Sequence, residues 1–376
     1  MEKYVGDAKV NTIERVFAFL FAVFFIAQIL SPSINSRTIY LEIVLMMINP
    51  YFWRWLMPLK WTYSKTLVVI LLISIAALGH AVTALKIFMN IFSATVLAYL
   101  WERKIWYING VLYVSILIAF MQLSLMAVDV NLAFMLGPQN ISESIWGTFA
   151  TQTSTNLYDA MGIGIPRAAG LSREAGFLAS LMVVVIIHRM LLNQKSKCVK
   201  LVYSVGYIAS FSKMSLVLVP AYFVVKLKKY INKIHFVFWL FLFLTIMLMF
   251  WHSEKEFLND SINITFLSRF GAYDSLWHLD AYQLLFGEEN LSKIGGISAI
   301  NEYYGENLYA GLGGWIIYNG LLVFGAFVLL LMAVGINSAG VVLLLLTTIN
   351  VQPDANQNFV VYAWFLCMSY FKDKRI

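Results

Sequence analysis

Charged side chains are scarce in this sequence of 376 residues. Asp, Glu, Lys and Arg make up only 12% of it, whereas hydrophobic residues make up 60%. Soluble domains carry about 25% charged residues, so this composition excludes an ordinary soluble domain. Cysteine is scarce too: Cys198 lies in a basic loop and Cys367 inside the last apolar run. Two cysteines placed in this way do not form a disulfide framework.

Signatures of metal and nucleotide sites are missing as well. The five histidines are scattered, with no HExxH pattern and no Cys/His pair at ligand spacing, and no Walker-type phosphate loop occurs. We therefore expect no metal and no cofactor; a less favoured alternative is a metal site of Asp274, His278 and Asp280. The net charge of +7 comes from basic residues in short loops between apolar runs. Such residues orient a protein in the bilayer, so we expect no nucleic-acid partner.

What the chain does contain is a series of long apolar runs, broken by charge, proline and glycine. A spanning helix needs about 20 apolar residues. The sequence therefore predicts an all-α polytopic membrane protein with about twelve transmembrane helices, forming a single integral membrane domain over residues 1–376 in a lipid bilayer. The expected spans are 14–30, 38–56, 66–80, 83–100, 105–128, 174–192, 199–211, 213–227, 234–251, 307–333, 337–350 and 356–371.

The basic residues are distributed unevenly about these spans. With both termini in the cytoplasm, all but eight of the 27 lysines and arginines fall in cytoplasmic segments, as the positive-inside rule requires. Two long loops then lie outside, at about 129–173 and 252–306, and loops of this length are often functional. The eight basic residues expected outside are Arg37, Lys86, Arg167, Arg173, Lys213, Lys255, Arg269 and Lys293.

The first outer loop ends in a basic segment, Pro166–Phe177. We expect Ser172 to cap a helix that begins at Arg173. A cation is disfavoured at a helix N-terminus, so Arg173, with Arg167 nearby, indicates that an anion binds there. Glu174 suits the positive end of the helix. Alternatively, Arg173 reaches lipid headgroups or pairs with Glu174.

Two further outer cations stand in informative surroundings. Lys213 follows two serines at a hinge between short apolar passes, where an ionisable residue usually marks a substrate path; the alternative is a surface lysine on a tight turn. Arg269, Tyr273 and Trp277 share one face at helical spacing. A guanidinium backed by aromatic rings suits a pyrophosphate or a sugar. The alternative is an ion pair between this arginine and a nearby aspartate.

A carboxylate opens the tenth apolar run, in Glu306-Asn307-Leu308-Tyr309. Glu306 is expected where the helix begins, facing outside, so it could act as a general base toward a hydroxyl or compensate the helix dipole. The centres of the spans are almost free of charge, with Glu42 and Lys86 as the nearest exceptions. Transporters tend to place ionisable residues in mid-span and to contain inverted repeats, so this pattern disfavours a transporter.

Together these features resemble the bacterial O-antigen polymerase (Wzy) family, which is grouped with the O-antigen ligases. The resemblance covers nearly the whole chain in layout, with short motifs. Ligases commonly carry a histidine before the asparagine that corresponds to Asn307 here. Glu306 in place of that histidine favours a polymerase. The motifs are Ser172–Phe177 entering a span, Ser212-Lys213-Met214 in the broken span pair, Arg269-x7-Trp277, Phe286-Gly287 and Glu306-Asn307-Leu308-Tyr309.

The resemblance implies a metal-independent, inverting glycosyltransferase with a GT-C-like fold in the bacterial inner membrane. Such an enzyme joins undecaprenyl-diphosphate-linked oligosaccharide repeat units at the periplasmic face, with a flippase and a chain-length regulator as partners. The alternatives are a ligase that transfers polymer to lipid A core and, less favoured, a transporter of an anionic solute. On this interpretation the diphosphate is bound by Arg167, Arg173, Lys213 and Arg269, and the sugars by Tyr273, Trp277, Asn307 and Tyr309. The catalytic residues would be Arg173 and Arg269, with Glu174 or Glu306 as the general base.

Overall fold

The computed structural model is mostly α-helical, and its contacts group into two compact units. Unit 1 comprises Met1–Lys60 and Phe92–Leu216, and unit 2 comprises Trp61–Ile91 and Val217–Ile376. The expected single membrane domain over residues 1–376 stays a prediction. The structure describes residues 10–34, 37–57, 63–151, 167–194, 196–210, 219–257, 267–290, 294, 309–349 and 351–371.

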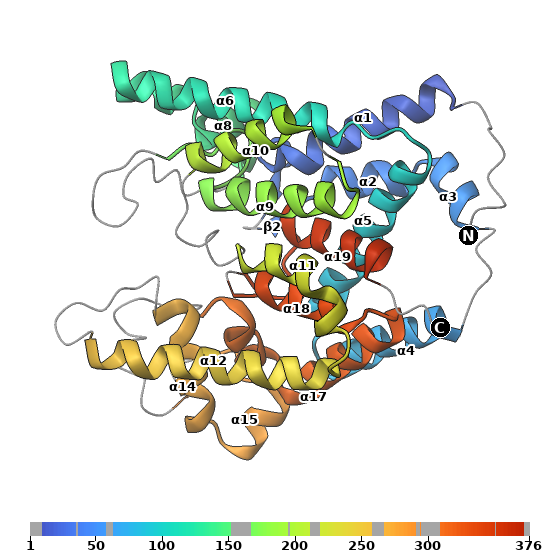
Figure 1. Ribbon diagram of the computed structural model, residues 1–376, viewed down its shortest axis with the longest axis vertical. Helices are drawn as coiled ribbons and strands as arrows, with labels where there is room; N and C mark the ends of the chain where they lie inside the picture. The colour runs from blue at the N-terminus through green and yellow to red at the C-terminus, as the bar shows by residue number, and fades with distance from the viewer. Residues whose placement is uncertain are drawn as a thin grey trace. The chain divides into compact units, whose positions relative to one another are not determined.

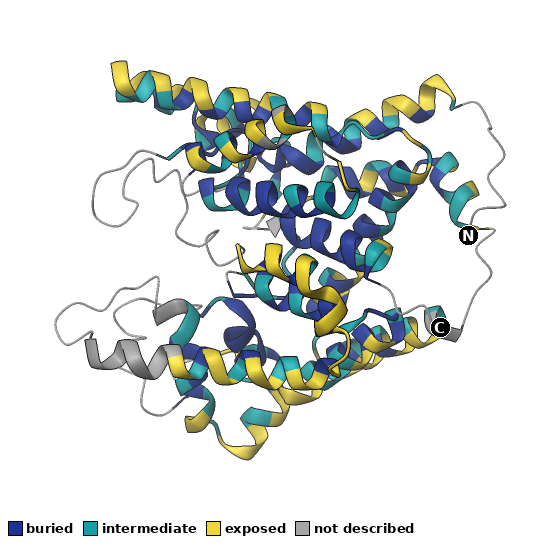
Figure 2. Ribbon diagram, in the orientation of Figure 1, coloured by how far each residue is buried: buried dark blue, intermediate teal, exposed yellow. Residues whose placement is uncertain are grey.

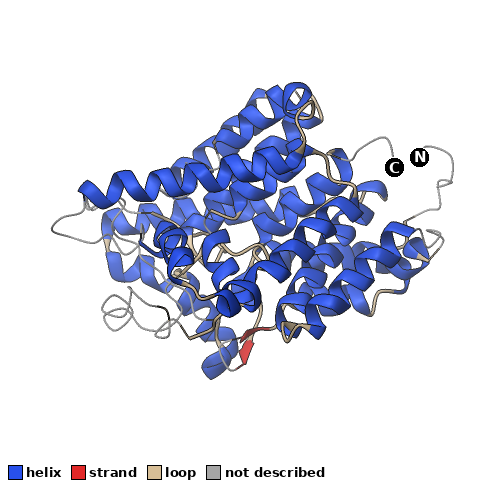
Figure 3. Ribbon diagram, turned by 90° about the horizontal axis from the view of Figure 1, so that it is seen from below, coloured by secondary structure: helices blue, strands red, loops and turns tan. Residues whose placement is uncertain are grey.

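In unit 1, helices α6, α9 and α10 lie side by side, and α1 contacts α2 and α6 (Figure 1). A two-stranded antiparallel hairpin follows the first helix (Figure 3). The elements of this unit are α1 (Thr12–Ile26), η1 (Gln28–Leu30), β1 (Ser33–Ile34), β2 (Arg37–Thr38), α2 (Leu41–Met47), α3 (Pro50–Leu56), the second half of α5 (Ala81–Glu102), α6 (Ile108–Val128), α7 (Val130–Met135), α8 (Pro138–Trp146), η2 (Gly147–Phe149), α9 (Ala175–Leu191) and α10 (Lys197–Ser210).

In unit 2, α17 packs against α4 and α15, while α18 packs against α11, α12 and α19. Between α12 and α17, the described residues 267–290 form several short helical turns. The elements are α4 (Tyr63–Ala77), the first half of α5, α11 (Pro220–Ile231), α12 (Phe236–Phe257), the π-helical turn η4 (Leu267–Gly271), α14 (Ala272–Ser275), η5 (Leu276–His278), α15 (Ala281–Phe286), α17 (Gly311–Val334), α18 (Ser338–Thr347) and α19 (Asn358–Tyr370).

Three described helices, α5, α6 and α17, are long and apolar enough to cross a membrane, and six apolar helices are shorter. Large apolar side chains are exposed along α6 at one-turn spacing, at Val114, Leu117 and Met121 (Figure 2). An exposed apolar stripe of this kind fits contact with lipid rather than water. The apolar helices therefore indicate a membrane-embedded protein, and the count of twelve spans stays a prediction.

The expected span 38–56 is not one continuous helix, which corrects the sequence interpretation. It consists of α2 and α3, separated at Ile48 and Asn49. Pro50 occupies the first position of α3, where its missing N–H costs nothing. The buried Asn49 side chain accepts hydrogen bonds from the amides of Tyr51 (2.9 Å) and Phe52 (3.4 Å). The Asn-Pro pair is thus a helix start inside an apolar run.

Helix α17 is kinked at Gly320, whose φ of 78° and ψ of 169° favour glycine strongly. The end of α15 fits into this kink, because the amide of Glu288 donates to the Ile317 carbonyl at 2.8 Å. A Cβ atom at position 320 would lie 2.3 Å from the Leu285 carbonyl oxygen and 2.6 Å from the Gly287 nitrogen. The kink thus joins residues 285–288, at the end of α15, to a long helix through backbone contact.

We expect Gly320→Ala to lower the free energy of unfolding by more than about 3 kcal/mol, since strained backbone and a backbone clash add. Gly79→Ala is the matched control, because Gly79 also has positive φ (91°) but nothing lies within 4 Å of its added Cβ. The control should lose only about 1–2 kcal/mol. Thermal unfolding of both variants in detergent measures the difference in stability. Equal losses of stability would contradict the close backbone contact between α15 and α17 at Gly320.

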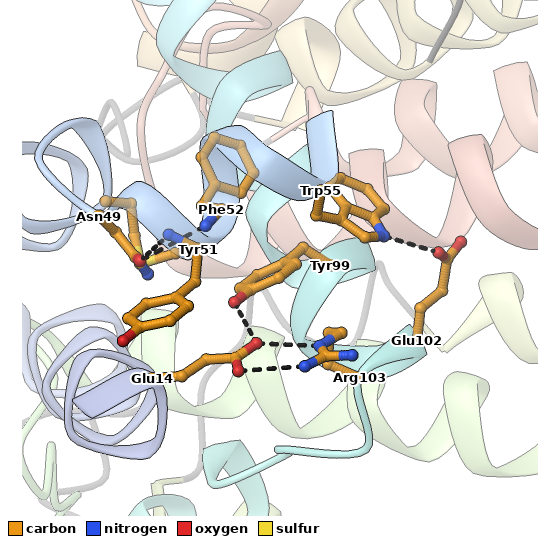
Figure 4. A network of polar contacts seen from close by, with 9 residues as sticks. Glu14, Asn49, Tyr51, Phe52, Trp55, Tyr99, Glu102 and Arg103 are labelled. Atoms are coloured by element: carbon orange, nitrogen blue, oxygen red, sulfur yellow. Dashed lines mark hydrogen bonds and ion pairs between the residues drawn. The ribbon is translucent and has the colours of Figure 1, made fainter. Parts of the chain in front are cut away.

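A buried ion pair joins α1 to the end of α5 in unit 1. The Glu14 carboxylate, 3% exposed, accepts from Tyr99 Oη at 2.6 Å and from Arg103 Nε at 2.9 Å and Nη2 at 3.1 Å (Figure 4). Nearby, the Trp55 indole donates to Glu102. A buried carboxylate needs such a set of donors to offset its lost hydration.

We expect Arg103→Met to cost about 3–5 kcal/mol of stability, because it leaves the Glu14 charge buried without its cation. Adding Glu14→Gln in the same chain should recover part of this loss, since the charge is then removed. Thermal unfolding of both single variants and the double variant gives the coupling energy. Strictly additive losses would show that the pair does not act as a unit.

Candidate functional site

The basic segment 167–173 is fixed to α6 by two fully buried polar side chains. Gln122 donates to the Gly170 carbonyl at 3.1 Å and accepts from its amide at 2.9 Å, so it binds both backbone groups of one residue. Ser115 Oγ accepts from the Leu171 amide at 3.0 Å. Just before, the Ala168 amide donates to Ala209 at the end of α10. The chain between Arg167 and Arg173 is thereby held at defined points.

Gly170 is required where this segment touches α6. Its φ is 57°, and an added Cβ atom would lie 2.4 Å from the Ser115 carbonyl oxygen. Only glycine allows the backbone of the segment to approach the helix so closely. The positions of Arg167 and Arg173 therefore depend on a backbone contact between Gly170 and α6, which a side chain at position 170 would disrupt.

Helix α9 begins two residues later than expected, which corrects the prediction for Ser172 and Arg173. Glu174 is its N-cap residue, without a side-chain capping bond, and Ala175 is the first helical residue. Ser172 is buried in the bend before it. Arg173 thus precedes the helix, so an unfavourable dipole no longer argues for a bound anion. The surroundings of Arg173 still favour a bound anion, because the side chain is partly buried and its guanidinium is held by a hydrogen bond to the Tyr40 hydroxyl.

Tyr40 and Glu42 were not among the expected site residues, although they belong to this group in unit 1. Tyr40 directly precedes α2, and its hydroxyl interacts electrostatically with the side chains of both Arg173 and Glu42. Glu42 is 3% exposed, and its Oε2 atom has no hydrogen-bond partner among the described residues. Ionisable residues in apolar surroundings usually mark functional sites. The signal was in the sequence, since Glu42 stands out in an apolar run.

In unit 2 the expected shared face of Arg269, Tyr273 and Trp277 is interrupted. Arg269 lies in the π-helical turn η4, Tyr273 in α14 and Trp277 in the 3-10 turn η5. Three successive helix types rotate the side chains differently, so regular helical spacing does not hold. Tyr273 is 2% exposed and Trp277 is 76% exposed.

The buried tyrosines of unit 2 fix the segment that carries Arg269. Burial raises the pKa of the Tyr273 hydroxyl, and a hydrogen bond from the Gly313 amide acts in the opposite direction. Tyr309 Oη lies 2.8 Å from Ser275 Oγ, and Tyr309 packs with Ala272 in one hydrophobic cluster. These contacts give both rings a packing role at the start of α17. Among the three aromatic residues predicted to bind sugar, Trp277 is the exposed one.

The alternative metal site is not supported by the described residues. Asp280 accepts from the Gln283 amide and caps α15, while His278 Nδ1 lies 3.2 Å from the Asp274 carbonyl oxygen. No group of three or more His, Cys, Asp or Glu side chains suited to a metal occurs in the described part of the chain. The expected site residues Lys213, Glu306 and Asn307 lie outside the described residues.

The structure thus groups the expected residues within each unit. Arg167, Arg173 and Glu174 lie in unit 1 with Tyr40, and Arg269 lies in unit 2 with Tyr273, Trp277 and Tyr309. That both groups bind one ligand stays a prediction. No family model, curated protein or solved structure matches the chain. Fold and composition define the class as a mostly α-helical protein with apolar helices suited to a membrane.

Proposed function

We propose that this protein is a polysaccharide polymerase of the O-antigen type, which joins undecaprenyl-diphosphate-linked repeat units at the outer face of a bacterial inner membrane. The proposal includes twelve spans, cytoplasmic termini and a GT-C-like arrangement. One observation carries it: a partly buried arginine, Arg173, lies in a loop segment that buried side chains hold in place. A lipid diphosphate is the anion expected at such a site near a bilayer.

Two contacts within unit 2 are consistent with the proposed threading of the spans. His80 Nε2 lies 3.0 Å from the Phe286 carbonyl oxygen, and both residues are expected outside. At the other end, the Asn232 side chain accepts from the Ala339 amide at 2.9 Å; Asn232 lies in a loop expected in the cytoplasm, and Ala339 lies at the end of a span expected on that side. Each contact thus joins segments that the proposed threading puts on one side of the membrane.

In the proposed reaction, a hydroxyl at the non-reducing end of an incoming lipid-linked unit attacks the anomeric carbon of the growing chain. A new glycosidic bond forms, the bond from this carbon to the diphosphate oxygen breaks, and the lipid diphosphate leaves. Arg167, Arg173, Lys213 and Arg269 stabilise the charge that develops on it, which is usually the dominant contribution in such transfers. The hydroxyl proton passes to Glu174 or Glu306, and the buried Glu42 is a third candidate.

The decisive experiment uses purified full-length protein with lipid-linked repeat unit. A polymerase converts it into a ladder of longer lipid-linked chains, with or without a chelator. A ligase instead leaves single units unchanged and transfers preformed polymer to lipid A core. Transport of the unit across a sealed vesicle without any change in chain length would favour a transporter. Either of these last two results rejects the proposed activity.

A further inference from the structure

The segment between α18 and α19 in unit 2 places polar side chains in buried surroundings. Its sequence is Gln352-Pro353-Asp354-Ala355-Asn356-Gln357-Asn358. Asp354 is 2% exposed and Asn358, the first residue of α19, is fully buried. We refer to residues 352–358 as the polar loop. Buried polar groups in a protein this apolar need a specific reason.

Side chains from the first half of α5 and from the N-terminal part of α17 contact the polar loop. Asn90 Nδ2 donates to the carbonyls of Pro353 (3.5 Å) and Ala355 (3.3 Å). Lys86, one turn before Asn90, lies 3.4 Å from Asp354 Oδ2. Burial raises the pKa of the Asp354 carboxyl, whereas Lys86 and the indole of Trp315 act to lower it. Side chains from two helices, α5 and α17, therefore converge on one carboxylate.

Several buried polar atoms of the polar loop and of Asn90, which contacts it, have no hydrogen-bond partner among the described residues. Both Oδ1 and Nδ2 of Asn358 are of this kind. Each such atom costs about 1–3 kcal/mol when it stays unpaired. Folded proteins contain few of these atoms, and they rarely occur together. The others are Asn90 Oδ1 and Gln357 Oε1.

The chemistry of the cluster selects among ligands. A metal cation is disfavoured because Lys86 already neutralises the charge of Asp354. An anion is disfavoured by the carboxylate itself. What remains is a neutral ligand that both accepts from the Asn358 amide and donates to several oxygens. Hydroxyl groups do both at once, and those of a sugar are spaced to meet several partners.

We propose that the polar loop, with Lys86, Asn90 and Trp315, is a saccharide-binding site that takes the hydroxyl groups of a neutral sugar residue. This inference rests on the proposed polymerase function, which supplies the oligosaccharide. It assigns sugar recognition to residues other than Tyr273, Trp277, Asn307 and Tyr309. The tyrosines among those pack in the unit 2 core.

The test compares two side chains of the polar loop, which carry buried polar atoms without a hydrogen-bond partner among the described residues, with a buried asparagine of unit 2 whose hydrogen bonds are satisfied. Asn358→Leu and Gln357→Met remove unpaired groups at nearly constant volume, so we expect a melting temperature equal to or above that of the wild type. Asn319→Leu is the matched control, because Asn319 accepts from Thr83 Oγ1 at 2.7 Å and donates to the Trp315 carbonyl at 2.9 Å. The control should melt several degrees lower, by the loss of satisfied hydrogen bonds.

Binding is then measured with the oligosaccharide repeat unit released from its lipid, titrated into full-length protein and followed by thermal shift. We expect saturable stabilisation of the wild type and about 10-fold weaker binding by Asn358→Leu and by Gln357→Met. Glycerol at matched hydroxyl concentration should have no saturable effect. The proposal is overturned if the wild type shows no saturable shift. It is also overturned if both variants bind as the wild type does, which would mean that internal water fills the cluster.

The ladder assay on the same wild-type protein separates this proposal from the function itself. A wild type that makes ladders while both variants bind and polymerise normally rejects the polar loop as a sugar site and leaves the polymerase intact. A wild type that makes no ladder, but whose oligosaccharide binding is lost in the variants, keeps the sugar site and rejects the polymerase.

Discussion

Replacing Arg173 by alanine should reduce polymer formation by about 100- to 1000-fold, the usual loss when one group that stabilises transition-state charge is removed. Arg173 lies partly buried, bonded to Tyr40, in a loop segment held from both sides. A guanidinium in such a position is restricted in motion and can bind two phosphate oxygens at once. Arg173→Lys should retain part of the activity, since the charge stays but the paired donors are lost.

Arg15→Ala is the matched control for this prediction. It removes the same charge from unit 1, but Arg15 is exposed on the first turn of α1, at the end expected in the cytoplasm. The ladder should then be unchanged. Chain length is read on a gel from cells and from purified protein, with thermal unfolding as a check of folding. A folded Arg173→Ala variant that still makes full-length ladders would remove this residue from the site.

A methyl group added at Gly170 should eliminate polymer formation without touching any charged residue. Its Cβ would lie 2.4 Å from the Ser115 carbonyl oxygen and 2.7 Å from Ser115 Oγ, so the segment must move away from α6. This movement breaks the paired hydrogen bonds to Gln122 and displaces Arg167 and Arg173. A shift of about 1 Å in a positioning element can cost 100-fold in rate.

Gly147→Ala separates the clash from the backbone strain. Gly147 belongs to the same unit and has the same φ of 57°, but nothing lies within 4 Å of its added Cβ. We expect this variant to lose about 1–2 kcal/mol of stability and to keep its ladder. Similar ladders from the two variants would show that the fit of the segment on α6 is unimportant for activity.

The sequence was sufficient where the physical signal is long and regular. Apolar runs of about 20 residues predicted α5, α6 and α17 to within a few residues, because burial of apolar surface dominates there. It failed at shorter signals inside those runs. Asn49-Pro50 breaks the second expected span, and the bend at Ser172 delays the start of α9. Both depend on hydrogen bonds that composition does not report.

The basic residues of the site could be selected from the sequence, but their surroundings could not. Arg173 was identified from its charge on the expected outer side, and the structure adds Tyr40 from a distant part of the chain. Tyr273 and Tyr309 are predicted to bind sugar, yet both are buried, and Tyr309 packs with Ala272 and Ile317 in one cluster. The periodicity of a sequence predicts on which face of a helix a side chain lies. Whether that face is exposed or buried depends on how segments distant in the sequence pack against it.

The most direct measurement compares two lipids that differ only in their head. Purified protein is titrated with undecaprenyl diphosphate and with undecaprenol, and the affinities are compared for wild type, Arg173→Ala and Arg269→Ala. If outer-face arginines bind the diphosphate, the wild type prefers the charged lipid by at least about 10-fold, and each variant loses most of that preference. Equal wild-type affinity for both lipids would mean that these cations do not bind the substrate head, and the polymerase proposal would lose its physical basis.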